Sequence, residues 1–335
     1  MQLLVTGATG FLGYRTIEYL LQQTGVDSIL ATGRTLKPSH SHQHPKLRYQ
    51  LGDLSDSAFV ASLFDTPITH VVNCASLSSP WGAYQAFYQA NCLSQQYLIQ
   101  QSERNGVQKF VYISSPSVYF TGTDRLQISE DEALPKKFVN VYAATKYEAE
   151  QLLATSRLAF ITLRPRALIG RGDTVIMPRL IRSQREGKLK TIGKGDTLVD
   201  LTHVANVAHA IWLALQAPPA ATRQVYNISN GEPVKLWPYI EKVLQELSLS
   251  LPKQKVPERV AYIAAQLMEW SAQLRPGKQE PALTTYSIGT LTKSMTLDIS
   301  KAQKLLGYSP QFSTQEALDE FITWYKSLPS DASIL

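Results

Sequence analysis

After two residues the chain reads Leu3-Leu4-Val5-Thr6-Gly7-Ala8-Thr9-Gly10-Phe11-Leu12-Gly13. The apolar run at its start is typical of a buried parallel strand, and a helical pattern of apolar and aromatic residues begins at Phe11. Gly7 allows a tight turn, Gly10 lets backbone N–H groups approach a pyrophosphate, and Gly13 lets the helix pack on the strand. The positive end of the helix dipole favours the same anion. The segment therefore predicts a dinucleotide-binding loop formed by Gly7, Thr9, Gly10, Phe11, Leu12 and Gly13.

Length and composition indicate a globular protein. The 335 residues are 44% hydrophobic and 18% charged, enough for the core of one large or two smaller domains. Cys74 and Cys92 provide no disulfide framework, which indicates a reducing compartment. The early strand leaves no place for a signal peptide, and no apolar run reaches the roughly 20 residues that span a bilayer. We expect a cytoplasmic protein whose net charge of +6 is ordinary surface charge.

The second predicted strand, Ser28 to Thr32, ends at Gly33-Arg34 and indicates which cofactor is bound. In NAD-binding proteins an acidic residue about 20 positions past the glycines contacts the ribose 2′-hydroxyl. No Asp or Glu stands there in this chain, and Arg34 can pair with a 2′-phosphate and lie on the adenine face. The sequence therefore predicts NADPH/NADP+ in preference to NAD.

Two polar features follow before the next buried strand. His40, His42 and His44 alternate in a loop without an accompanying acid or cysteine, so a polar, flexible surface loop is favoured and no metal site is predicted. A third strand is expected at Leu47 to Leu51. Asp53 comes directly after it, where its side chain could cap the helix that begins near Ser55.

A Tyr and a Lys stand at i and i+4 on one face of a predicted helix, as Tyr142 and Lys146. A free tyrosine keeps its proton to about pH 10, and a nearby ammonium lowers that pKa toward the working range. Ser115 follows a buried strand, Phe110 to Ile113, whose carboxyl end borders the ligand crevice. These side chains predict an acid–base site, whereas Glu148 and Glu150 on the same helix are expected to be solvated.

The combination resembles the extended branch of the short-chain dehydrogenases/reductases. The resemblance rests on the TGxxGxxG spacing from Thr6 to Gly13 and on the Ser115, Tyr142 and Lys146 set, and it covers almost the whole chain. Within that branch the chain is similar to the 3β-hydroxysteroid dehydrogenase group, most of all to bacterial 2-alkyl-3-oxoalkanoate reductases. The segments that suggest this are Trp81-Gly82-x-Tyr84, Pro116-Ser117-Val118, Arg164-Pro165-Arg166 and Ile228-Ser229-Asn230-Gly231-Glu232-Pro233.

The resemblance also assigns roles to single residues. It implies that Ser115 and Tyr142 are catalytic, and that Lys146 is catalytic and also holds the nicotinamide ribose. Asn91 matches an Asn of the extended members, with an interior structural amide as the alternative. The remaining cofactor contacts that the resemblance implies are made by Asp53 and Leu54 at the adenine, Pro165 along the nicotinamide, and the small residues Cys74, Ala75 and Ser76 after the strand that starts at His70.

The implied reaction reduces a ketone beta to a carboxylate, on an apolar skeleton, to the 3-hydroxy acid with NADPH. Trp81, Tyr84 and an apolar helical stripe from Val260 to Trp270 are expected walls for this substrate, and Arg166 is hypothesised to meet the carboxylate. The stripe is interpreted as core or as the lid of an apolar pocket in preference to a membrane anchor. The expected partners are a small apolar keto or hydroxy substrate, no nucleic acid, and a second copy of the chain in a homodimer. Association with a membrane surface or a pathway enzyme is left open.

The predicted fold is α/β. It consists of a doubly wound parallel Rossmann sheet and a smaller, mostly helical C-terminal substrate-binding region. Residues 1–170 form the NADP-binding domain, with later strands contributed by 198–230, and residues 171–330 are mainly substrate-binding.

Three alternatives to the 3-oxo acid reductase remain open. The first is a 3β-hydroxysteroid (sterol) dehydrogenase. The second is a nucleotide-sugar epimerase or dehydratase, for which an acid near position 34 would be expected. The third is a non-catalytic NADP-sensing protein, for which the Tyr142 and Lys146 pair would not be expected.

Overall fold

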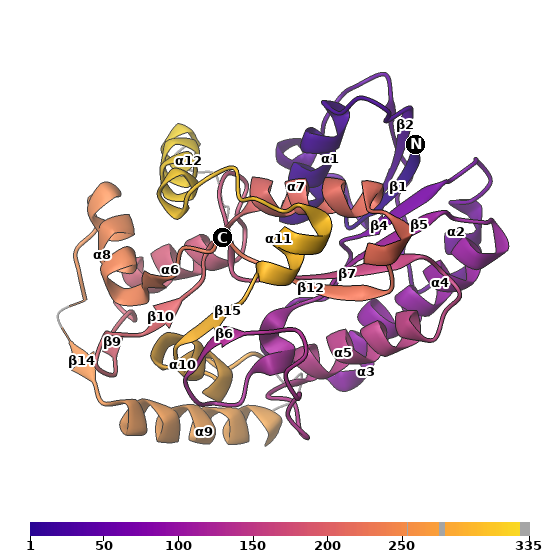
Figure 1. The fold of residues 1–335 in the computed structure, drawn as a ribbon. Coiled ribbons are helices and arrows are strands. Elements are labelled where there is room, and N and C mark those ends of the chain that lie inside the picture. Colours follow the sequence, from indigo (N-terminus) through magenta and orange to yellow (C-terminus); the bar gives the residue numbers. More distant parts are fainter. Residues whose placement is uncertain (253, 275–278, 329–335) are drawn as a thin grey trace.

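A seven-stranded parallel sheet forms the centre of the protein (Figure 1). The structure is a computed structural model that describes residues 1–252, 254–274 and 279–328, so the last two residues of the predicted 171–330 region lie outside the described residues. The strand order is β12-β7-β5-β4-β1-β2-β3. Its strands are β1 (Gln2–Thr6), β2 (Ser28–Thr32), β3 (Leu47–Tyr49), β4 (His70–Asn73), β5 (Lys109–Ile113), β7 (Phe160–Pro165) and β12 (Gln224–Ile228).

Helices cover both faces of this sheet, which confirms the doubly wound architecture. Because side chains alternate along a strand, Leu3 and Val5 of β1 enter the core on one face and Leu4 enters the core on the other. The first face is covered by α1 (Phe11–Leu21), α7 (Val204–Gln216) and α11 (Ser300–Leu306), and the second by α2 (Ser57–Ser62), α4 (Ser94–Arg104) and α5 (Val141–Ala154).

The strand order reverses between β1 and β4, which both pair in parallel with their neighbours. In open parallel sheets the carboxyl ends of the strands at such a switch point border the ligand crevice. Asn73 joins these two ends, since its Oδ1 accepts hydrogen bonds from Thr6 Oγ1 at 2.5 Å and from the backbone N–H of Ala75 at 3.0 Å. The ligand crevice is therefore expected beside Thr6 and Asn73.

A second region is built around a four-stranded sheet of order β13-β10-β15-β6. These strands are β13 (Val234–Lys235), β10 (Leu198–Val199), β15 (Met295–Leu297) and β6 (Arg125–Ile128). Two further pairs join β8 (Leu168–Ile169) to β11 (Thr202–His203) and β9 (Thr191–Ile192) to β14 (Lys255–Val256). The helices of this region are α6 (Ile176–Arg185), α8 (Leu236–Glu246), α9 (Glu258–Leu274), α10 (Thr285–Thr292) and α12 (Thr314–Ser327).

The chain crosses between the two regions more than once. Strand β6, from the first half of the chain, pairs with β15 of the second region, whereas α7, β12 and α11 return to the central sheet. Of the strands within 198–230, β12 extends the central sheet, whereas β10 and β11 do not. Those two short strands pair with β13, β15 and β8 instead.

The stripe on α9 was interpreted as core or as the lid of an apolar pocket, and the core alternative is wrong. Its side chains are 56% to 64% exposed at Val260, Ile263, Leu267 and Trp270. The buried side of α9 consists of alanines, namely Ala261, Ala265 and Ala272, because small residues let this helix approach its neighbours closely. Helix α9 lies at the edge of the molecule (Figure 1), and its largest apolar side chains are exposed. Within the described ranges, no helix has the length and apolar character needed to cross a membrane.

Candidate active site

The predicted glycine loop connects β1 to α1. Gly7 has φ +64°, and a Cβ there would lie 2.7 Å from the backbone N of Ala75, so the segment after β4 approaches the glycine loop too closely for a side chain. A Cβ at Gly13 would lie 2.2 Å from the carbonyl oxygen of Gly7. Gly10 is the N-cap of α1, and because it has no side chain it does not cap the first backbone N–H groups of the helix. The cradle therefore fits a dinucleotide pyrophosphate, whose charge those N–H groups and the helix dipole would hold.

The loop after β2 holds Arg34 at the surface, close enough to Asp53 to affect its ionisation. Hydrogen bonds from the backbone and side chain of Ser55 lower the pKa of Asp53, and the charge of Arg34 lowers it further. The N-cap of α2 is Asp56, which accepts from Ala58 N at 2.9 Å, so the capping alternative for Asp53 is wrong. Arg34 and Asp53 thus occupy one side of the expected adenine end of the cofactor.

The histidine loop packs against α1. The ring of His42 stacks on Tyr14, with ring centroids 4.2 Å apart, and its Nε2 lies 3.0 Å from the backbone oxygen of Tyr14. His40 is buried, and its Nε2 lies 3.2 Å from the carbonyl oxygen of Gly172. The expectation of a flexible polar loop is therefore wrong for these two histidines, because aromatic packing and backbone hydrogen bonds hold them.

The small residues after β4 lie beside Gly7. Burial raises the pKa of the Cys74 thiol to about 12, so this cysteine is a packed, protonated residue. Asn91 is buried in the π-helical turn Tyr88–Leu93, where its amide bonds both backbone groups of Leu77 and the hydroxyl of Thr145 on α5. These contacts support the structural alternative for Asn91, which ties the loop after β4 to the helix of Tyr142.

Ser115 and Tyr142 are brought together by two elements that are distant in sequence. Ser115 caps the 3₁₀ turn Pro116–Tyr119 after β5, and Tyr142 lies in the first turn of α5, whose N-cap is Asn140. The hydroxyl of Tyr142 is close enough to those of Ser115 and Ser78 for both serines to lower its pKa. Burial raises the pKa of Tyr142 more than these serines lower it, so the tyrosine holds its proton more firmly than a free one.

Lys146 is buried one turn further along α5. Its Nζ donates to the carbonyl oxygen of Ile113 at 2.6 Å and lies over the ring of Tyr112, 4.6 Å from the centroid. Burial lowers the pKa of Lys146 to about 8. The expected lowering of the pKa of Tyr142 is not seen in this state, because burial outweighs the two serines that oppose it and Lys146 is held at the end of β5.

Ser78 is a contact that sequence reasoning missed. It stands in the loop after β4, and the available signal was the run of hydroxyl residues Ser76, Ser78 and Ser79 at the carboxyl end of a central strand. Glu150 was also misjudged. It is 4% exposed and accepts from Arg164 Nε at 2.9 Å, so it belongs to a buried ion pair between α5 and β7 rather than to the surface.

The three single residues predicted to contact the substrate, Trp81, Tyr84 and Arg166, lie in different parts of the structure. Tyr84 is 48% exposed and donates its hydroxyl hydrogen to Glu148 at 2.9 Å, on the outer side of α5. Trp81 is partly buried in the loop that carries Ser78, where its backbone is hydrogen-bonded to Ser79. Arg166 is buried just past Pro165 at the end of β7, and within the described residues its Nε has no hydrogen-bond partner.

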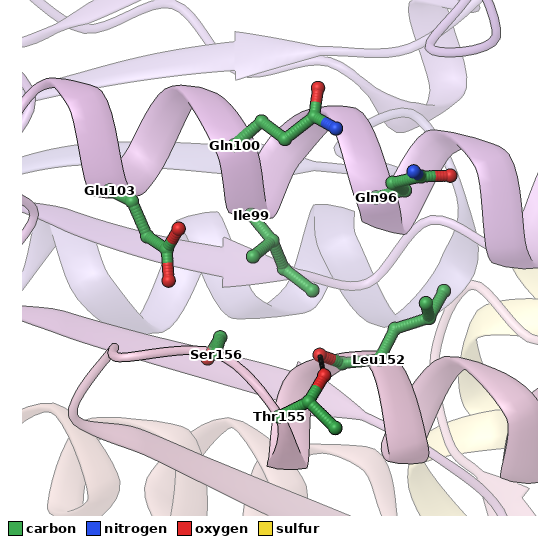
Figure 2. A pocket seen from close by; sticks show the side chains of 7 residues that line it. All are labelled: Gln96, Ile99, Gln100, Glu103, Leu152, Thr155 and Ser156. Atoms are coloured by element: carbon green, nitrogen blue, oxygen red, sulfur yellow. Dashed lines mark hydrogen bonds between the residues drawn. The ribbon is translucent and has the colours of Figure 1, made fainter.

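A surface groove of about 210 Å³ lies elsewhere, between α4 and α5 (Figure 2). The groove lies at the carboxyl end of α5, whereas Tyr142 lies at the amino end. At a rise of 1.5 Å per residue, the two ends of this helix are about 20 Å apart. The groove is therefore not part of the catalytic site. Its lining consists of Gln96, Ile99, Gln100, Glu103, Leu152, Thr155 and Ser156.

The fold is that of a dinucleotide-binding α/β enzyme, and Ser115, Tyr142 and Lys146 lie at the carboxyl edge of its central sheet as a candidate site. A family model described as "NAD dependent epimerase/dehydratase family" matches residues 3–229. The chain belongs to this family, the extended short-chain dehydrogenases/reductases, and it is an NAD(P)-dependent oxidoreductase.

Relatives support the group predicted from the sequence. The chain is 31% identical to 2-alkyl-3-oxoalkanoate reductase of Stenotrophomonas maltophilia, over 95% of this chain and 97% of that protein. It is 29% identical to mouse sterol-4-alpha-carboxylate 3-dehydrogenase, decarboxylating, over 98% of this chain and 91% of that protein. Among solved structures, it matches Bordetella bronchiseptica WbmH in complex with NAD+ with a TM-score of 0.77 and 20% identity, over 98% and 99% of the two chains.

Proposed function

We propose that this protein reduces a 3-oxo acid of the 2-alkyl-3-oxoalkanoate type to the 3-hydroxy acid with NADPH. The observation that carries this proposal is the buried Arg166, whose Nε has no partner among the described residues. A buried polar group without a hydrogen-bond partner is costly, so a guanidinium with a free donor at the carboxyl edge of the central sheet supports an anionic group on the substrate. Both relatives named above have a carboxylate in the name of their substrate, which supports the same conclusion.

In this reaction Tyr142 is the general acid. Its raised pKa keeps the phenol protonated, so a proton is present for the ketone oxygen. The Ser115 hydroxyl, which lies near that of Tyr142, would bond the same oxygen and stabilise the charge that develops there. When bound, NADPH supplies the hydride that adds to the carbonyl carbon, so the substrate gains one hydride and one proton.

The remaining predicted residues would hold the cofactor. The glycine loop from Gly7 to Gly13 would bind the pyrophosphate, and Lys146 would hold the nicotinamide ribose. We assign Arg34 to the 2′-phosphate of NADPH, since its guanidinium is exposed at the end of β2. Arg34→Ala should lower kcat/KM for NADPH by roughly tenfold or more, as expected for loss of a charged hydrogen bond, and leave kcat/KM for NADH nearly unchanged. Equal losses with both cofactors would contradict this assignment.

The substrate is tested by NADPH consumption on a long-chain 2-alkyl-3-oxo acid and on a 3-oxosteroid, with NADH in parallel. Turnover of the acid would support the proposal. Turnover of the steroid alone would favour the 3β-hydroxysteroid dehydrogenase alternative, which several relatives carry in their names. NAD bound tightly through purification, with no net reduction of either substrate, would favour a nucleotide-sugar epimerase or dehydratase. Absence of any turnover, with NADPH binding retained, would favour an NADP-sensing protein.

The expected partners also belong to this proposal. We propose a cytoplasmic homodimer, for which sedimentation of the full chain is the direct test. Association with a membrane surface or a pathway enzyme would be assigned to α9, because its exposed apolar residues lie along one stripe at i, i+3, i+7 and i+10 from Val260 to Trp270.

A further inference from the structure

Arg166 forms no hydrogen bond with its acidic neighbour, Asp200, among the described residues. Asp200 is buried, and its Oδ2 accepts from the backbone N–H of Leu297 at 2.7 Å rather than from the guanidinium. Its Oδ1 has no hydrogen-bond partner in the part of the chain that the structure describes. Burial raises the pKa of Asp200 to about 6, more than the charge of Arg166 lowers it. The guanidinium therefore retains hydrogen-bonding capacity for a ligand.

Arg166 and Ser115 leave neighbouring parallel strands at the same edge of the sheet, since Ile113 of β5 pairs with Leu163 of β7. Burial raises the pKa of Tyr286 of α10, the charge of Arg166 lowers it and Tyr142 raises it further, so the phenol lies within electrostatic range of both side chains. Its hydroxyl forms no hydrogen bond with another described residue, unlike that of Tyr84.

Packing independent of any titration places Tyr286 there. Its ring contacts Phe120 edge to face, with centroids 5.4 Å apart, and Phe120 closes the 3₁₀ turn that Ser115 begins. A Cβ at Gly289 would lie 2.4 Å from Phe120 Cζ, so α10 is seated directly on this segment. A capping box between Thr284 and Ser287 fixes where α10 begins. Tyr286 is therefore held over the turn that carries the catalytic serine.

We propose that Tyr286 and Arg166 together form the site that binds the carboxylate of the substrate. The inference rests on the proposed function, and it adds a residue from the far end of the chain that aligns the ketone with Ser115 and Tyr142. In a 3-oxo acid one carbon separates the carboxylate from the ketone. An anion site adjacent to Tyr142 therefore fixes both groups at once. The phenol donates one hydrogen bond and the guanidinium another, and two donors on a carboxylate restrict its rotation.

The test compares Tyr286→Phe with the wild type on a 2-alkyl-3-oxo acid and on its methyl ester. The phenylalanine keeps the ring contact with Phe120 and removes only the hydroxyl. We expect KM for the acid to rise about 10- to 100-fold, as for a lost hydrogen bond to a charged group, with little change for the ester. Tyr262→Phe, at an exposed tyrosine on α9, is the matched control and should change neither. An equal loss with acid and ester would overturn the proposal, since it would indicate a structural role alone.

A binding measurement separates this inference from the proposed reaction. A saturated 2-alkyl fatty acid has the carboxylate but no ketone, and calorimetry can measure its binding to the protein with NADP+. Binding that weakens in Tyr286→Phe and is abolished in Arg166→Gln would support the anion site even if the keto acid is not turned over. Equal binding to the wild type and both variants would overturn the anion site, even if the keto acid is reduced.

Discussion

Helices α5 and α9 depart from the usual amphipathic rule in opposite ways. Helix α5 buries polar side chains, namely Thr145, Lys146 and Glu150, whereas α9 buries only alanines and exposes its large apolar side chains. Each buried polar group of α5 has a partner, which is Asn91, the carbonyl of Ile113 or Arg164. Buried polar groups that are fully bonded are costly to disturb, and exposed apolar groups are not. The two helices should therefore respond very differently to substitution.

The largest effect is expected at the start of α5. Tyr142→Phe removes the proposed proton donor and keeps the ring, so kcat should fall by about 10²- to 10⁴-fold. Binding of NADPH, measured by fluorescence, should stay within about twofold, because the substitution leaves the glycine loop intact. A variant with near wild-type kcat would mean that another group donates the proton.

The buried ion pair of α5 should be the next most sensitive feature. Glu150→Gln leaves the guanidinium of Arg164 without its counter-charge in the interior, which should lower the free energy of unfolding by about 3–5 kcal/mol. Glu148→Gln, two positions earlier, should lower the free energy of unfolding by about 1 kcal/mol or less. Among the described residues, the carboxylate of Glu148 is bonded only to the exposed hydroxyl of Tyr84 and to the weakly donating thiol of Cys92. Urea denaturation of both variants measures the difference. Equal losses would mean that burial at position 150 has no energetic consequence.

The pH dependence of cofactor capture tests Lys146. Burial lowers the pKa of Lys146 to about 8, so the side chain is mainly the charged ammonium below pH 8 and loses this charge as the pH rises through that value. If this charge holds the cofactor, kcat/KM for NADPH should fall about tenfold per pH unit above pH 8, since this parameter reports the free enzyme. Lys146→Arg, which stays charged, should show no such fall. A fall at the same pH in both proteins would assign the titration to another group.

The smallest effects are expected on α9. Leu267→Gln and Trp270→Gln should change the free energy of unfolding by no more than about 0.5 kcal/mol, because both side chains are already in solvent. Ala265→Leu, on the buried face of the same helix, should cost about 1–3 kcal/mol through overpacking. Flotation with phospholipid vesicles tests whether the exposed stripe of α9 binds a membrane. Binding by the wild type that is lost in the Gln variants would support membrane association, and no binding by the wild type would count against it.

Part of this protein follows from the sequence alone. The glycine loop, the strand at Ser28–Thr32 and the Tyr142 and Lys146 spacing are local patterns, because turns, helix faces and strand ends depend on neighbouring residues. These patterns were sufficient for the fold class, the family and the type of reaction.

Only the tertiary structure decided which distant residues meet. Glu150 was expected at the surface because its sequence context does not contain Arg164, which lies on β7. The stripe on α9 was expected to be buried because periodicity shows that apolar residues share a face and not whether another element covers it. Tyr286 carries no motif, and only the packing of α10 on Phe120 places it beside Arg166 and Tyr142. Sequence periodicity encodes local geometry, whereas contacts between segments hundreds of residues apart depend on how the elements pack.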